Sequence, residues 1–165
     1  QFLMEGAAMP AVSLRGAVKL PTGNQADFFG SGSLDFGLGL AVEKLVAGRW
    51  MLYANMTGVI PTGTIAGIGL QPTFSGLAAI EYLWSENFSI TTHFDYYSSP
   101  FELTGINTFD KDVTESVLGF NYRVLPHILW QMNAVENEDF ITGSAADFTL
   151  STVFTYRFEP SSSRQ

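Results

Sequence analysis

Cysteine is absent from these 165 residues, so neither disulfide bonds nor thiolate metal sites contribute to the fold. Basic residues are scarce: 8 Lys and Arg stand against 16 Asp and Glu, for a net charge of -8. Without a basic cluster to follow a phosphate backbone, we expect no nucleic-acid partner. No apolar run reaches the ~18 residues of a membrane-spanning helix, so the sequence predicts none. We also expect no cofactor and no metal.

Apolar residues, at 46% of the chain against 15% charged, are abundant enough for a folded domain and argue against disorder. We expect residues 1–165 to form a single domain. Within it, residues 1–10 are interpreted as the end of a preceding strand and a turn, and residues 159–165 as a tail.

Alternation of apolar and polar residues is the dominant pattern. From Asp147 to Phe158 it continues over twelve residues, which is close to the ~9 to 11 of a strand that crosses a bilayer at a tilt. The same alternation predicts seven further strands, at residues 11–20, 34–43, 50–60, 74–84, 88–96, 118–124 and 130–134. Short turns and long loops alternate between them, and no segment has a helical pattern. The predicted fold is all-β: an antiparallel up-and-down transmembrane β-barrel with about eight visible strands.

Side-chain volume indicates which face of these strands lies outside. Roughly thirty large apolar side chains share one parity, more than the narrow interior of an eight-stranded barrel accommodates. The opposite parity carries small residues and charges, which suit a crowded polar interior. Since a soluble lipocalin-like barrel produces the same alternation, a ligand-binding barrel of that kind remains an alternative.

Charged residues on the polar parity are predicted to form a network inside the barrel. Such a network either plugs a narrow barrel or sets the field of a pore. Lys19 and Asp35 are expected to approach each other across the first hairpin. The residues assigned to the network are Arg15, Lys19, Asp35, Glu43, Glu81, His93, Asp95, Arg123 and Arg157.

Aromatic residues concentrate beside the short turns, as in the interfacial girdle of a membrane barrel, where indole and phenol rings are favoured. Since short turns alternate with long loops, as at the periplasmic and extracellular ends of outer-membrane barrels, we predict that the short-turn end faces the periplasm. The residues assigned to this girdle are Trp50, Trp84, Trp130, Tyr82, Phe88, Tyr156 and Phe158.

His93 and Asp95 lie two residues apart beside Ser89, which provides the residue types of a nucleophile and its base. Positions i and i+2 of one strand point the same way, ~7 Å apart, and no catalytic motif surrounds them, so a hydrogen-bonded pair is the favoured interpretation. Glu136, Glu138 and Asp139 carry the ligand type for a divalent cation, but a solvated acidic loop is the simpler interpretation.

Two similar breaks, Lys19-Leu20-Pro21-Thr22-Gly23 and Val59-Ile60-Pro61-Thr62-Gly63, accompany a Gly-rich run from Gly30 to Leu40. With these motifs the chain resembles uncharacterised outer-membrane proteins regarded as transporters, including the group named after the meta-pathway of phenol degradation. The resemblance implies a Gram-negative outer-membrane location, with lipid, lipopolysaccharide and the barrel insertion machinery as partners. Those relatives are generally longer, so the chain is expected to be the C-terminal part of a larger barrel.

The function predicted from these features is that of a passive channel or transporter for small solutes, or of a structural barrel, and not of an enzyme. A lipid-modifying enzyme, such as a lipid hydrolase on the barrel wall, remains the catalytic alternative.

Overall fold

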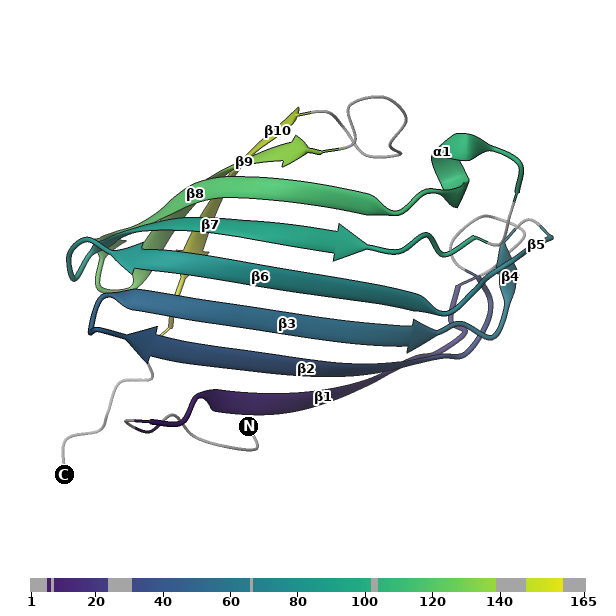
Figure 1. Ribbon diagram of the computed structural model, residues 1–165, viewed down its shortest axis with the longest axis horizontal. Helices are drawn as coiled ribbons and strands as arrows, with labels where there is room; N and C mark the ends of the chain where they lie inside the picture. The colour runs from purple at the N-terminus through teal and green to yellow at the C-terminus, as the bar shows by residue number, and fades with distance from the viewer. Residues whose placement is uncertain are drawn as a thin grey trace.

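The computed structural model describes residues 6, 8–23, 31–65, 67–101, 104–138 and 148–158. Eight strands form one antiparallel sheet in the order β1-β2-β3-β6-β7-β8-β9-β10, and a small hairpin, β4-β5, stands apart from it (Figure 1). The strands are β1 (Ala11–Lys19), β2 (Asp35–Val46), β3 (Trp50–Ile60), β4 (Thr64–Ile65), β5 (Ile68–Gly69), β6 (Thr73–Leu83), β7 (Phe88–Tyr97), β8 (Val113–Leu125), β9 (Ile128–Asn137) and β10 (Phe148–Tyr156).

The sheet is a meander, because each main strand pairs with the next one along the chain. This confirms the prediction of an all-β antiparallel fold with eight strands. The sheet is open: within the described ranges no ladder joins β1 to β10, so both are edge strands. A four-residue helix, α1 (Asn107–Asp110), lies in the long connection between β7 and β8, where sequence periodicity predicted only a loop.

Several strands are longer than the sequence predicted. β2 continues to Val46, so only three residues, Ala47 to Arg49, connect it to β3; Ala47 and Gly48 both have positive φ (50° and 68°), and the Arg49 amide donates to the carbonyl oxygen of Val46. Two successive residues of this kind give a type I′ turn, whose twist matches that of the flanking strands. β8 begins at Val113 and β9 runs to Asn137, at the start of the acidic segment that was interpreted as a loop. Asp147 and Asp139 fall outside the described residues.

The pairing register of the strands keeps even-numbered residues on one face of the sheet and odd-numbered residues on the other. Even-numbered residues pair only with even-numbered ones, as in Leu40 opposite Leu14 on one side and Met56 on the other, until a bulge near the end of β8. We call the surface of the even-numbered residues the outer face and that of the odd-numbered residues the inner face. Because side chains alternate along a strand, most of the large apolar residues of the eight strands lie on the outer face.

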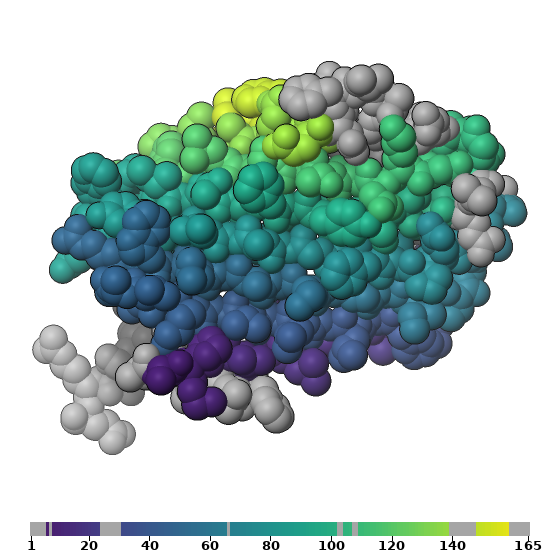
Figure 2. Space-filling view, in the orientation of Figure 1, coloured from purple at the N-terminus to yellow at the C-terminus, as the bar shows by residue number. Residues whose placement is uncertain are grey.

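The sheet curls so that its inner face is enclosed. In Figure 1, β10 passes behind the strands that face the viewer, and Figure 2, in the same orientation, shows side chains covering the near side of those strands. Burial agrees with this curvature: inner residues such as Asp95 and Val117 are 7% and 4% exposed, whereas outer Leu38 and Phe154 are 62% and 67% exposed. The sheet therefore buries a polar face and exposes an apolar one.

Close packing explains the small residues on the inner face. A Cβ on Gly119 would lie 2.0 Å from Oδ1 of Asn133 and 2.7 Å from the carbonyl oxygen of Met132. The directly opposite residue on β9 is Asn133, so no side chain larger than hydrogen fits at position 119 without movement of the backbone.

Candidate functional site

Inner-face polar side chains form separate clusters, and the largest surrounds the carboxylate of Glu81 on β6. Tyr53 donates its hydroxyl to Glu81 Oε2 at 2.6 Å, while Ser89 and Asn121 donate to Oε1, the latter at 3.0 Å. Gln131 extends the cluster by donating to Asn121 Oδ1 at 2.8 Å. Five strands, β3 and β6 to β9, thus contribute to one hydrogen-bonded group, which is possible because the curled sheet brings β6 and β8 together over β7.

Glu81 is held by neutral donors only. Three hydrogen bonds satisfy a carboxylate well, but they leave its negative charge without a compensating cation among the described residues. A hollow of about 270 Å³ lies beside this cluster, with Glu86, Asn121 and Arg123 in its lining. The cluster therefore holds a carboxylate in a fixed position at the turn end of the inner face.

His93 and Asp95 form the second cluster, on β7. Nε2 of His93 lies 3.1 Å from Oδ2 of Asp95, with the histidine side chain 22% exposed and the aspartate largely buried. Ser89, the nucleophile of the catalytic alternative, donates to Glu81 and belongs to the first cluster. The observed contacts thus link histidine to carboxylate, and serine to a different carboxylate.

The third cluster lies at the end of the inner face that carries the long loops. Lys19, the last residue of β1, donates to Oδ2 of Asp35, the first residue of β2, and also to the hydroxyl of Ser31. This confirms the prediction that Lys19 and Asp35 approach each other. Oδ1 of Asp35 accepts hydrogen bonds from the Ser33 hydroxyl and the Thr62 amide, both at 3.2 Å, so one carboxylate joins three chain segments.

The remaining charged residues of the predicted network do not connect these clusters. Arg15 and Glu43 line a hollow of about 350 Å³ near β1, and Arg123 and Arg157 line another of about 330 Å³ beside His127. Of the residues assigned to the network, Lys19 forms an ion pair with Asp35, and His93 with Asp95. The inner charges are thus distributed along the face as local groups.

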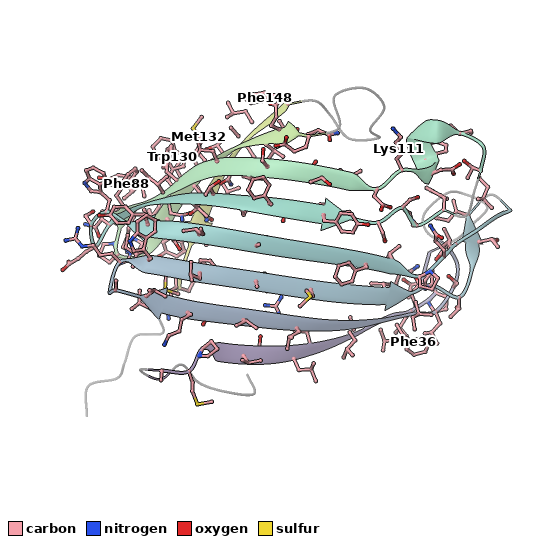
Figure 3. All side chains as sticks on the ribbon, viewed as in Figure 1. Phe36, Phe88, Lys111, Trp130, Met132 and Phe148 are labelled. Atoms are coloured by element: carbon pink, nitrogen blue, oxygen red, sulfur yellow. The ribbon has the colours of Figure 1, made fainter. Side chains whose placement is uncertain are left out.

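Aromatic residues of the outer face form a band at the short-turn end, as Figure 3 shows for Phe88 and Trp130. Trp50 contacts Tyr82 at 4.6 Å between ring centroids, and Tyr82 contacts Trp84 at 6.1 Å. Further contacts continue the band over β8, β9 and β10, and Tyr156 and Phe158 extend it at 4.6 Å. All seven residues assigned to the girdle therefore lie on one face at one end of the sheet.

Sequence reasoning did not single out the neutral members of these clusters, Tyr53, Ser31, Asn121 and Gln131. Tyr53, Asn121 and Gln131 have odd positions on predicted strands, which place them on the inner face, whereas Ser31 lies in the segment that leads into β2. The pairing register that brings Asn121 to Glu81 across an intervening strand cannot be read from alternation alone.

Two further aspartates, both in the long connection after β7, were also missed. Asp112 accepts the Ser99 amide at 2.9 Å, and Asp110 accepts both the amide and the hydroxyl of Thr104 at 2.7 Å. These bonds give the connection a fixed shape at the long-loop end.

Chemically, the inner face offers hydrogen bonding and local charge. In the parts of the chain that the structure describes, no group of three or more His, Asp or Glu side chains is arranged to hold a metal ion. Helices long and apolar enough to cross a membrane are not found there either.

Comparison with known proteins gives a family but no activity. A search of curated proteins gave no match to the chain. The profile of a family described as "Protein of unknown function (DUF3187)" matches residues 1–158, which is nearly the whole chain. The chain therefore belongs to the DUF3187 family.

Proposed function

We propose that this protein is a β-barrel of the bacterial outer membrane that lets small solutes pass through a polar interior. The observation that carries the proposal is the inverted burial of the sheet: polar inner residues of its central strands, such as Ser89 and Asp95, are buried, and large apolar outer residues are exposed on every main strand except β9. In water, an exposed apolar surface of this extent favours aggregation. In a membrane, the same apolar surface contacts the acyl chains of the lipid, as the outer surface of a transmembrane barrel does.

Strand length and the aromatic band support a membrane location. The eight main strands have 9 to 13 residues, which brackets the ~9 to 11 needed to cross the hydrocarbon core at a tilt. The aromatic band borders the apolar region at the short-turn end, and Phe36, Phe74 and Tyr96 lie towards the other end. Two aromatic levels separated by aliphatic residues are typical of a membrane barrel with two interfaces.

The two edges of the sheet support a barrel with more than these eight strands. Lipid has no hydrogen-bonding groups to satisfy the outer edges of β1 and β10, so an open sheet is not stable there. In the proposed barrel, further strands pair with both edges and close the wall. A wider barrel also leaves space between the inner clusters, which favours a pore over a plugged interior.

The two alternative functions receive less support. A lipocalin-like barrel encloses its apolar ligand against inward apolar side chains, whereas here those side chains are on the outer face. A wall-bound hydrolase requires a nucleophile in contact with its base, whereas Ser89 is bonded to Glu81 and His93 to Asp95.

Heat-dependent migration in a detergent gel, followed by conductance in a planar bilayer, tests the proposal. We expect the detergent-extracted protein to migrate differently before and after boiling, because a closed barrel resists unfolding by detergent, and to give discrete conductance steps. Free solubility without detergent would contradict the membrane location. A heat-modifiable protein without conductance would leave a barrel that has a structural role only.

A further inference from the structure

An apolar hollow lies at the long-loop end of the inner face, which is otherwise polar. Its volume is about 530 Å³, within the range of sites for small molecules. Seven of its fourteen lining residues carry hydrocarbon side chains, contributed by the ends of β1 and β3, the β4-β5 hairpin and the segments that follow β5 and β7. We call this hollow the rim niche; the walls that matter here are Val59, Pro61, Ile65, Leu70 and Pro100.

Hydrogen bonds hold the walls of the rim niche in place without a ligand. Gln71 donates its side-chain amide to the carbonyl oxygens of Ser99 and Phe101, at 3.0 and 2.9 Å, which ties the segment after β5 to the segment after β7. The backbone amide of Gln71 also donates to the carbonyl oxygen of Pro100. Because the walls are already ordered, a ligand does not bear the entropy of arranging them.

The wall formed by Pro61 is held just as firmly. Thr62 donates its amide to Asp35, and a Cβ on Gly63 would lie 2.5 Å from the Cβ of Ser33. The Pro-Thr-Gly break after β3 therefore packs directly against the segment that leads into β2. This packing gives a physical reason for glycine in that motif.

The floor of the rim niche is polar but has no net charge. Lys19 and Asp35 neutralise each other, and Asp35 is occupied by Lys19, Ser33 and Thr62. An ammonium group has three donors, and Lys19 uses two of them on Asp35 and Ser31 while its side chain remains 50% exposed. Among the described residues, one donor of Lys19 is thus left without an acceptor, beside the apolar walls of the rim niche.

From this arrangement we infer that the rim niche binds an uncharged amphipathic molecule, with an apolar body and one acceptor oxygen such as a hydroxyl or carbonyl. The apolar walls cover the body, and the free N–H of Lys19 binds the oxygen. The carboxylate of Asp35 repels an anionic ligand, and the ammonium of Lys19 repels a cationic one. Both therefore bind more weakly than an uncharged ligand of the same shape. The inference rests on the proposed function in one respect, that the inner face is open to water, and it names the class of solute that enters there.

Methyl NMR of the full chain in lipid nanodiscs, with 1-hexanol as the probe, tests this inference. We expect a saturable shift of the Ile65 methyl signals, and binding weaker by about tenfold for hexanoate and for hexylammonium, which have the same chain and one charge. Ile80, exposed on the outer face, is the internal reference for hexanol that merely dissolves in lipid. Its shift is expected to rise linearly with concentration.

A matched pair of variants locates the binding. Val59→Phe fills the rim niche and is expected to abolish the saturable shift, whereas Ile80→Phe adds an aromatic ring to the outer face and leaves the shift unchanged. A linear shift at Ile65, an undiminished shift in Val59→Phe, or equal affinity for hexanol and hexanoate would each overturn the inference. Saturable binding without bilayer conductance would support ligand binding in the rim niche and contradict the channel function. Conductance with only linear shifts would support the channel function and contradict ligand binding in the rim niche.

Discussion

At the scale of single residues, carboxylates organise the loop-bearing end of this protein. Asp35 joins β1, the segment before β2 and the segment after β3, while Asp110 and Asp112 fix the connection between β7 and β8. Each accepts backbone amides that have no strand partner. Without such acceptors those amides would depend on water.

Asp110 provides a residue-scale prediction about pH. The hydroxyl and the amide of Thr104, with a smaller contribution from the Gly105 amide, lower the pKa of Asp110 below its ordinary value of 3.8. A lowered pKa means that the stabilisation is complete above 3.8 and is lost as the pH falls through the lower value of the folded loop. We expect hydrogen-exchange protection of the Thr104 and Gly105 amides near neutral pH and its loss in strong acid.

Asp110→Ala should remove the same protection at neutral pH, since alanine has no acceptor. The Ser99 amide, which is bound to Asp112, is the internal reference and should keep its protection in this variant. Protection at Thr104 that is the same in the wild type and in Asp110→Ala would show that another group orders the loop.

At the scale of strands, parity decides which face each side chain occupies. Leu38 lies on the outer face between Gly16 and Gly58, whereas Thr149 lies on the inner face opposite Val135. In the proposed membrane barrel, Leu38→Arg should cost ~2 to 4 kcal/mol near the midplane, because the guanidinium enters hydrocarbon. Thr149→Arg should cost much less, because its side chain points to the polar interior.

Unfolding in urea from lipid vesicles measures both costs, and Phe154→Arg is a second outer-face variant on the same strand as Thr149. Similar costs at the two kinds of position would refute the proposed assignment of the outer face to lipid. Large costs at positions 38 and 154, with a small one at 149, would support it.

Strands are also the scale at which the sequence was most informative. Alternation located all eight main strands and their faces, because each strand has one apolar and one polar side over most of its length. The predicted ends of strands were wrong where apolar and polar residues no longer alternate. Lys44, for example, occupies an outer position of β2, donating to the carbonyl oxygen of Gly6 at 2.6 Å, so a charge that suggested a turn belongs to a strand.

The candidate site was predictable in part. Lys19 and Asp35 were paired correctly because both flank one hairpin, so their contact follows from local geometry. Tyr53 and Asn121 were not associated with Glu81, since that contact depends on the curl of a sheet across several strands. The rim niche was not predicted at all, because most of its walls come from segments without periodicity, which meet the ends of β1 and β3 only in the folded chain.

At the scale of the whole molecule, the two ends of the sheet differ. One end has short turns and the aromatic band, and the other has the long connections, α1, the β4-β5 hairpin and the rim niche (Figure 1). In bacterial outer-membrane barrels, short turns face the periplasm and long loops face the exterior. The resemblance to outer-membrane transporters remains a prediction, and this asymmetry offers a test that does not depend on it.

Single cysteines report the orientation directly, because the chain has none of its own. Ile106→Cys places a thiol on an exposed residue next to α1, and Glu86→Cys places one in the exposed turn between β6 and β7. In intact Gram-negative cells, a maleimide too large for porins should label position 106 and not position 86, since the outer membrane separates them. Both should react after the outer membrane is permeabilised, which controls for thiol reactivity. Labelling of position 86 alone in intact cells would reverse the proposed orientation, and would place the rim niche at the periplasmic mouth.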